Sequence, residues 1–544
     1  MKTKLVTVLC FILSLSKIIS ADVPCNSRQV EGNSNRLICV CNATYCDTIS
    51  RVEPQWGSFI TYTTSKAGSR FFKGIGSVVN RDQAPNVGRF GKVIELQPFK
   101  TFQTIIGFGG AATDATGLNW RNLPEDAQKN FINTYFSENG LEYSMIRTPI
   151  ASSDFSKKPY YYNEYPKHDK DLTNFTYTEQ DKDYKIPFLL EAMEVATEEV
   201  LVLATAWSPP QWMKIVDQHS TQSRLKDDYY QTYADYYCKF AKLYEKAGVP
   251  IWGVSTTNEP IDGNLMPISF GPKDTLGWTT KAMKKWIKNN FGPTMKKCTG
   301  KPMKILAIDD QRFMVPIWVT TIVEGDSDNS RYIDGYAVHA YTDPIVPGDI
   351  ISENLRRSPN KFVLATEYCE GSLPGSGGPV SLGNWDRGEN YALTILDNLV
   401  NNYVGFIDWN MALDLGGGPN WAKNFVDSPI IINATSGEFY KQPMFYVMGH
   451  FSKFIPRGSK RINTVRRSRI NYTPDENNIY ASNPERKDIY DHVAFLTPKK
   501  TIVVIIANYD EEQNAALLIG SQQVNVYLEA HSIVTVEFPF NGFY

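Results

Sequence analysis

The chain has 544 residues, of which 42% are hydrophobic and 13% aromatic, and its formal net charge is −2. This length exceeds what one hydrophobic core usually supports, so two or three domains are expected. The near balance of 56 basic and 58 acidic residues argues against nucleic acid as the partner.

The N-terminus has the pattern of a secretory signal peptide. Two lysines within the first four residues precede an apolar stretch from Leu5 to about Ser16, and the small residues Ser20 and Ala21 follow. A signal anchor is the weaker alternative, because the apolar stretch is shorter than the roughly 20 residues that a membrane span needs. We therefore predict that residues 1–21 are removed from a chain that enters the secretory pathway.

Secretion predicts oxidised cysteines. Seven remain after Cys10 is lost with the signal peptide, and four of them crowd the start of the mature chain: Cys25, Cys39, Cys41 and Cys46. Four cysteines allow three pairings. The other three are predicted to be free thiols: Cys238, Cys298 and Cys369.

Four Asn-x-Ser/Thr sequons are candidate sites for surface N-glycans. They lie at Asn42, Asn174, Asn433 and Asn471. The last is the weakest candidate, because Pro474 directly follows its threonine.

Eight short apolar, β-branched runs follow one another through the middle of the chain: Thr104–Gly109, Tyr143–Ile150, Val200–Trp207, Ile251–Asn258, Ile305–Gln311, Gly335–Tyr341, Phe362–Glu367 and Phe406–Asn410. Most are followed by a segment of helical composition, and helices are expected over Glu125–Phe136, Tyr229–Ala247 and Thr279–Asn290. Helical crossovers force parallel pairing of such strands, so eight repeats favour a (β/α)8 barrel, with an open doubly wound sheet as the rival.

Short strands and turns replace this pattern at both ends of the chain, in residues 25–103 and from about 459 onward. Thr501–Ala507 and Ile533–Phe538 are typical sandwich strands. We therefore predict a β-sandwich that is assembled from both chain ends.

Two of the barrel runs end in a glutamate. Ile251–Asn258 is followed directly by Glu259, and Phe362–Glu367 ends in Glu367. Side chains at the C-terminal ends of barrel strands face the active site, so these two carboxyls are predicted to meet over one cleft. There one protonated carboxyl can supply a proton to a leaving oxygen while the other, ionised, attacks an anomeric carbon, as in a retaining glycoside hydrolase. A structural salt bridge is the ordinary explanation for a single strand-end Glu, but it does not account well for the pair.

Polar and aromatic residues near other strand ends suit sugar recognition. Asn258 can donate to a sugar 2-hydroxyl beside the acid, and Asp154, just after the second run, can accept from hydroxyls. Trp207 and Trp409 offer an apolar face for a pyranose and an N–H donor. Taken singly, each of these aromatic residues is more often part of a core than a ligand contact.

Longer motifs carry a family resemblance across essentially the whole mature chain. They are Cys39–Cys46 (CVCNATYC), Ile106–Asp114 (IGFGGAATD), Asp309–Arg312 (DDQR), Gly418–Trp421 (GPNW), Asn424–Ile430 (NFVDSPI), Gln442–Tyr446 (QPMFY) and Gly449–Pro456 (GHFSKFIP). With these motifs the chain resembles the lysosomal acid β-glucosidases, the glucosylceramidases of glycoside hydrolase family 30.

The resemblance implies a three-part architecture. A small disulfide-stapled antiparallel sheet domain is expected from residues 22–56 and 410–442, and an immunoglobulin-like β-sandwich from residues 57–103 and 459–544. The (β/α)8 TIM barrel then comprises residues 104–409 and 443–458. Together with the residues themselves, the resemblance favours disulfides Cys25–Cys39 and Cys41–Cys46.

The resemblance also implies hydrolysis of glucosylceramide to glucose and ceramide, with Glu259 as acid/base and Glu367 as nucleophile. The residues that it implies for holding the glucosyl unit are Asp154, Trp207, Asn258 and Trp409. Residues that match positions at the mouth of the site are Tyr341, Asn424 and, at the lipid-facing entrance, Phe270.

Two departures from close relatives concern the aglycone. Position 340 is Ala where those relatives carry Trp, and residues 261–279 differ in length and composition. Both are expected along the path of the aglycone, so recognition of the sugar is better supported than recognition of ceramide.

No metal or other cofactor is expected. The six histidines show no paired ligand spacing, and the cysteines form no zinc pattern. The densest basic stretch comprises Arg457, Lys460, Arg461, Arg466, Arg467 and Arg469. It is either a solvated face or a surface that attracts anionic lipid and so brings the enzyme to a substrate held in membranes.

The leading hypothesis is thus a retaining β-glucosidase that acts on glucosylceramide in the lysosome lumen, with a secreted enzyme as second choice. The resemblance makes a saposin-like activator and a sorting receptor plausible partners. The alternatives are a glycoside hydrolase of the same family that acts on another β-glucoside, xylan or a β-glucan, and a catalytically silent sugar- or lipid-binding protein.

Overall fold

The computed structural model describes residues 22–542 except 86–90, 217–222, 264–273, 325, 373–377 and 467–485. The predicted signal peptide, Phe270, the sequon at Asn471, and Arg467 and Arg469 of the basic stretch lie outside the described residues. Among the described residues, no helix is long and apolar enough to cross a membrane.

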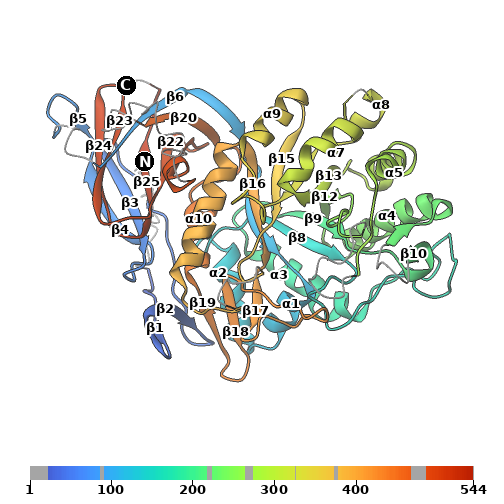
Figure 1. The fold of residues 1–544 in the computed structure, drawn as a ribbon. Helices are drawn as coiled ribbons and strands as arrows, with labels where there is room; N and C mark the ends of the chain where they lie inside the picture. Colours follow the sequence, from blue (N-terminus) through green and yellow to red (C-terminus); the bar gives the residue numbers. More distant parts are fainter. Residues whose placement is uncertain are drawn as a thin grey trace, which may run out of the picture.

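Eight parallel strands close into a barrel at the centre of the chain (Figure 1). In order around the barrel they are β12 (Ile251–Ser255), β13 (Lys304–Gln311), β14 (Gly335–His339), β15 (Phe362–Glu367), β16 (Tyr403–Asn410), β7 (Gly107–Ala111), β8 (Met145–Ile150) and β9 (Leu201–Ala206). Each coincides with a predicted run, so the barrel is confirmed and the open sheet is excluded. Buried side chains such as Met145, Leu203, Leu306 and Leu364 fill the interior, as a TIM barrel requires.

Helices cover the outside of the barrel. They include α2 (Glu125–Phe136), α3 (Ile186–Val195), α4 (Tyr230–Lys246), α5 (Thr280–Trp286), α6 (Gly292–Cys298), α7 (Val315–Ile322), α9 (Asp349–Arg357), α10 (Trp385–Val400) and α11 (Pro443–Ser452). The amphipathic pattern explains the buried faces of these helices. On α4, for example, Tyr233, Tyr237, Phe240 and Tyr244 recur at helical spacing and are fully buried.

A ten-stranded sheet joins the two ends of the chain beside the barrel (Figure 1). Its strands from the N-terminal part are β3 (Ser58–Ser65), β4 (Phe72–Ser77), β5 (Val79–Asn80) and β6 (Lys92–Thr104). Those from the C-terminal part are β20 (Lys460–Arg466), β21 (His492–Leu496), β22 (Thr501–Asn508), β23 (Gln513–Ile519), β24 (Gln522–Leu528) and β25 (Ser532–Pro539). Alternate residues of distant strands, including Ile94, Val504, Leu517 and Val536, share one core, so the sheet folds over itself as a sandwich.

A five-stranded sheet brings the first described residues against the segment after the barrel. Its order is β1 (Ser27–Val30), β2 (Asn33–Cys41), β19 (Glu438–Lys441), β18 (Ile430–Asn433) and β17 (Ala412–Asp414). The disulfides Cys25–Cys39 and Cys41–Cys46 staple it, in the pairing that the sequence analysis favours.

The prediction that Cys238 and Cys298 are free was wrong. They form a disulfide between α4 and the last residue of α6, with Cα atoms 5.5 Å apart. The two helices pack side by side, and a separation of 60 residues carries no local signal of that contact. Cys369 is a free, buried cysteine, as predicted.

Candidate active site

A cavity of about 410 Å³ opens at the C-terminal ends of the barrel strands. Every described residue that the sequence analysis assigned to the site lines it: Asp154, Trp207, Asn258, Glu259, Tyr341, Glu367, Trp409 and Asn424. Their origins are the ends of β9, β12, β14, β15 and β16 together with loops after β8 and β17. The barrel therefore gathers residues that are up to 270 positions apart in sequence.

The two predicted carboxyls face one another. A carboxylate oxygen of Glu259, one of Glu367 and a ring nitrogen of His339 all lie within 4.8 Å of one another. Glu259 has a left-handed backbone, with φ 41°, and its N–H donates to the Asp309 carbonyl at 2.9 Å. Such a backbone costs a non-glycine residue on the order of 1 kcal/mol, so the surrounding contacts must hold Glu259 in this direction.

Arg147 is the cation at the centre of the site. This fully buried side chain from β8 donates to Glu367 through Nη1. Its Nη2 donates to Asn258 Oδ1 at 2.7 Å and to Asp309 Oδ2 at 3.0 Å. The guanidinium carbon also lies 4.9 Å from the ring centroid of Trp207, a cation–π distance. One guanidinium thus fixes two carboxylates, an amide and an indole.

His339 is the second buried cation. Its Nδ1 lies 3.2 Å from Glu259 Oε1 and 3.8 Å from Glu367 Oε1, and its Nε2 lies 3.1 Å from Asp309 Oδ1. Burial alone lowers the pKa of His339, but the charge of Glu367 and the hydrogen bonds to Asp309 and Glu259 raise it to about 10. Burial opposes ionisation of Asp309, but the Arg147 charge and the His339 contact hold its pKa below the ordinary value.

Glu259, His339 and Glu367 thus contact one another as charge partners.

Neutral donors complete the surroundings of the two carboxyls. The Tyr341 hydroxyl donates to Glu367 Oε1 at 3.0 Å, and Gln311 Nε2 donates to Glu259 Oε1 at 3.1 Å. The buried Cys369 thiol lies 3.5 Å from the Tyr341 hydroxyl. Each carboxyl is thus held by side chains from other strands.

Aromatic and polar side chains form the remaining wall. The indoles of Trp207 and Trp409 stack with centroids 5.4 Å apart. Asp154 lies beside the amides of Asn420 and Asn424, with N···O distances of 3.4 and 3.5 Å. These groups offer a pyranose apolar contacts together with hydrogen-bond donors and acceptors.

Only one of the two departures from close relatives contributes residues to the lining of the cavity. Asp262, Asp274 and Thr275, all from the divergent segment 261–279, line the cavity. Ala340 is buried and does not line the cavity, whereas its neighbour Tyr341 does. The expectation that position 340 lies along the path of the aglycone therefore applies to the adjacent residues and not to Ala340 itself.

Asp274 anchors the described end of the divergent segment. Lys214 and Tyr161 donate to its carboxylate, and Ser208 Oγ donates at 3.2 Å. These contacts fix the position of one carboxylate at the rim.

Two described members of the basic stretch, Arg457 and Arg461, do not line this cavity. Arg457 donates to the carbonyls of Ile106, Ser144 and Glu199, each of which precedes a barrel strand, so it sits at the opposite end of the barrel. Arg461 is buried against Gln103 and Asn402. Arg461, on the sandwich strand β20, thus joins the sandwich to the barrel.

Sequence reasoning missed the two cations. Arg147 was included in a predicted strand, and His339 was considered only as a metal ligand. A lone Arg and a lone His inside buried apolar runs are the signals that could have marked them, because a buried charge needs a partner.

Comparison with known proteins identifies the family of the barrel and of the sandwich. Residues 105–455 match the model of the glycosyl hydrolase family 30 TIM-barrel domain, and residues 458–536 match the family 30 β-sandwich domain. Lysosomal acid glucosylceramidase of Mus musculus is 39% identical over 482 residues, covering 88% of this chain and 88% of the mouse protein.

Solved structures share the fold. SrfJ from Salmonella typhimurium has a TM-score of 0.77 at 21% identity and covers 89% of this chain and 100% of its own. The endo-β1,6-glucanase BT3312 has a TM-score of 0.71 at 23% identity, with coverage of 88% and 99%.

Three buried carboxyls near the site favour the protonated form. Burial and the charge of Glu259 raise the pKa of Asp310 to about 8. Burial raises the pKa of Asp343 to about 7 although Arg312 opposes it, and burial raises that of Asp408 to about 8.

We expect the folded chain to lose stability as the pH rises from 6.5 to 8. In this window Asp310, Asp343, Asp408 and His339 bind more protons in the folded chain than in the unfolded chain, where their pKa values are ordinary, so deprotonation favours unfolding. The expected loss is roughly 1 kcal/mol per group. His450, whose pKa burial lowers to about 3, is neutral in the folded chain, and its unfolded imidazole loses about half a proton over this window, which offsets the loss by less than about 0.5 kcal/mol.

The melting temperature measured by calorimetry at pH 6.5 and 8 tests this expectation. The drop should be smaller in Asp343→Asn and unchanged in the control Glu125→Gln, whose carboxyl is exposed. A melting temperature that rises with pH over this window would contradict the assignment.

Proposed function

Because the chain belongs to glycoside hydrolase family 30, we propose that it is a retaining β-glucosidase that hydrolyses glucosylceramide to glucose and ceramide. The observation that carries the reaction type is the facing pair Glu259 and Glu367, with carboxylate oxygens within 4.8 Å. The mouse relative, whose name is glucosylceramidase, supports the choice of substrate.

The spacing of the carboxyls favours double displacement. Retaining enzymes place the two groups about 5–5.5 Å apart, whereas inverting enzymes need roughly 6.5–9.5 Å to admit a water between carboxyl and sugar. At the observed spacing, Glu367 itself reaches the anomeric carbon. A covalent glucosyl–enzyme ester is therefore the expected intermediate.

In the first step, a Glu367 oxygen bonds to the anomeric carbon as the bond from that carbon to the ceramide oxygen breaks. Glu259 gives its proton to that oxygen, and ceramide leaves as an alcohol. In the second step, Glu259 takes a proton from water, the water oxygen bonds to the anomeric carbon, and the ester to Glu367 breaks. Glucose leaves with retained configuration, and both carboxyls return to their starting states.

The surrounding residues have distinct tasks in this scheme. Arg147 and the Tyr341 hydroxyl orient the Glu367 carboxylate, and His339 and Gln311 orient Glu259. The residues assigned to the glucosyl unit are Trp207, Trp409, Asp154 and Asn258, with Asn424 at the mouth. Phe270, at the predicted entrance, lies outside the described residues and stays a prediction.

The mouth of the site has the character of a membrane-facing surface. Ile345 lines the cavity and is 83% exposed, and Phe313 and Ile317, just after β13, are 43% and 56% exposed. Arg312 Nη1 donates to the Val346 carbonyl at 3.0 Å and so ties these two segments together. An exposed apolar side chain at the opening, with two more on the segment after β13, favours contact with a lipid surface that holds the substrate.

The lysosome lumen is the proposed compartment, with secretion as the second choice. Support comes from the name of the mouse relative and from the raised pKa values of Asp310, Asp343 and Asp408, because protonation of these carboxyls favours an acidic medium. A saposin-like activator and a sorting receptor stay predictions, as do glycans at Asn174 and Asn433.

We expect Glu367→Gln to abolish release of glucose from glucosylceramide in detergent micelles, because the amide cannot form the ester. Glu259→Gln should lower kcat/KM for glucosylceramide by about 10²–10⁴-fold but spare kcat/KM for a nitrophenyl glucoside, whose leaving group needs little protonation. The value of kcat should fall on both substrates, because hydrolysis of the common ester loses its base. Asp82→Asn, a surface change, is the control. Equal losses of kcat/KM on both substrates in Glu259→Gln would remove this residue from the role of acid.

The same assay separates the rival functions. Faster hydrolysis of xylan or a soluble β-glucan than of glucosylceramide would favour the other family activities. A silent binding protein would release no glucose from any of them.

If the mouth of the site contacts the membrane, the double variant Ile345→Asp with Phe313→Asp should bind liposomes more weakly than the natural chain does. Flotation with zwitterionic liposomes should show the loss, and Ile75→Asp, on the sandwich at 80% exposure, should bind as the natural chain does. Liposomes with anionic lipid test the separate prediction for the basic stretch. Unchanged binding of the double variant would contradict the proposed orientation.

A further inference from the structure

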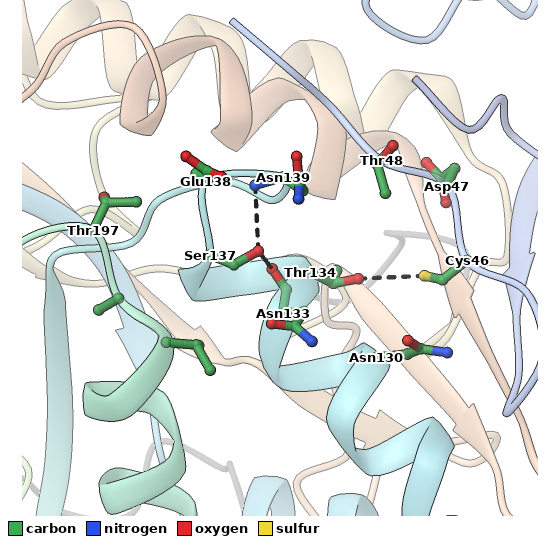
Figure 2. A pocket seen from close by; sticks show the side chains of 12 residues that line it. Cys46, Asp47, Thr48, Asn130, Asn133, Thr134, Ser137, Glu138, Asn139 and Thr197 are labelled. Atoms are coloured by element: carbon green, nitrogen blue, oxygen red, sulfur yellow. Dashed lines mark hydrogen bonds between the residues drawn. The ribbon is translucent and has the colours of Figure 1, made fainter. Parts of the chain in front are cut away.

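A second cavity, of about 490 Å³, lies between the N-terminal disulfide domain and the barrel. Three segments line it: residues 46–48, residues 130–139 at the C-terminal end of α2, and residues 195–197 after α3 (Figure 2). None of its lining residues belongs to the candidate active site. We call this cavity the α2 groove.

The α2 groove offers neutral hydrogen-bonding groups. Asn130, Asn133 and Asn139 supply amides, and Thr48 and Ser137 supply hydroxyls. Figure 2 shows these side chains gathered around the open space. Within the described chain, the amides of Asn133 and Asn139 have no hydrogen-bond partner. Neutral amides and hydroxyls suit a ligand rich in hydroxyl and amide groups, and an anion or a metal ion would find no matching charge there.

Two carboxyl groups line the groove, but neither places a free charge in its interior. Asp47 is buried, and Lys441 Nζ and the Tyr446 hydroxyl contact its carboxylate at 2.9 and 2.7 Å. Glu138 is exposed to solvent at the rim. The interior of the groove therefore presents uncharged groups.

The sequon Asn42-Ala-Thr44 lies at the edge of this groove. Asn130, a lining residue, donates through Nδ2 to the Asn42 carbonyl at 2.8 Å. Four residues after Asn42, Cys46 enters the groove wall, and its disulfide to Cys41 closes the turn that carries the sequon. The backbone of Asn42 is therefore joined to a residue of the groove wall, within reach of a glycan that starts on its side chain.

The Asn42 side chain is oriented for such an attachment. Its Oδ1 accepts from Thr44 N, Thr44 Oγ1 and Tyr45 N at 2.9–3.0 Å. Its Nδ2, the atom that a glycan modifies, has no partner among the described residues. By contrast, Nδ2 of Asn174 donates to the Tyr165 carbonyl at 2.9 Å and Nδ2 of Asn433 to the Tyr440 hydroxyl at 3.1 Å.

Given the Asn42 glycan that the sequon predicts, we propose that the α2 groove binds the first sugars of this glycan. The N-acetyl amides and hydroxyls of the glycan core take the hydrogen bonds that Asn133 and Asn139 leave open. Because the groove walls come from the disulfide domain and from α2, the bound glycan connects that domain to the barrel. The proposal is independent of the enzyme's substrate.

The rate at which an endoglycosidase releases the Asn42 glycan tests the proposal. The chain is produced in secreting eukaryotic cells, and release is followed by mass spectrometry of the peptide that contains Asn42, on native and on denatured protein. We expect release from the native protein to be slower, and the double variant Asn133→Ala with Asn139→Ala to speed it about tenfold, because two hydrogen bonds are lost. Both positions are exposed, and melting temperature checks that the variant folds.

Two further measurements make the outcome decisive. Asp126→Asn, an exposed change at the other end of α2, should release the glycan at the natural rate. Trimming of the glycan should speed hydrogen exchange in residues 130–139 of the natural chain but not of the double variant. An unmodified Asn42, or equal release rates in the natural chain and the double variant, would overturn the proposal.

Discussion

One buried guanidinium organises the catalytic end of this barrel. Arg147, from β8, bonds a carboxylate from β15, another from β13 and the amide that precedes Glu259. Removing one partner of a buried ion pair leaves an uncompensated charge, at a cost of about 3–5 kcal/mol, so these strands are held in register by electrostatics as well as by packing. His339 adds a second cation between Glu259, Glu367 and Asp309. The two cations thus contact three carboxyls between them, and the proposed hydrolysis depends on this arrangement.

The same environment links the site to acidic conditions. Asp310 lies beside Glu259 in the field of its charge, Asp408 precedes the Trp409 of the sugar wall, and Asp343 follows the loop residue Tyr341. All three are buried, and burial raises their pKa values to about 7–8. A barrel that keeps such carboxyls protonated is stabilised in a proton-rich compartment, which agrees with the proposed lysosomal location.

The sequence predicted the barrel, the sandwich and the facing glutamates because periodic apolar runs and strand-end carboxyls are local patterns. It did not predict what depends on spatial neighbours. Arg147 and His339 look like isolated polar residues inside apolar runs until the barrel closes and brings their partners around them. Cys238 and Cys298 pair only because α4 and α6 pack together. The family resemblance supplied site residues such as Asn424, which no local pattern indicates.

The proposed hydrolysis requires Glu367 to form a covalent bond to glucose while Glu259 transfers the proton. Incubation with a 2-deoxy-2-fluoro glucoside that has a good leaving group, followed by proteolysis and mass spectrometry, tests this requirement, because the fluorine slows breakdown of the ester. One added fluoroglucosyl group is expected on the peptide that contains Glu367, located on that residue by fragmentation. A label on any other residue would contradict it, as would inverted glucose released without a trapped intermediate.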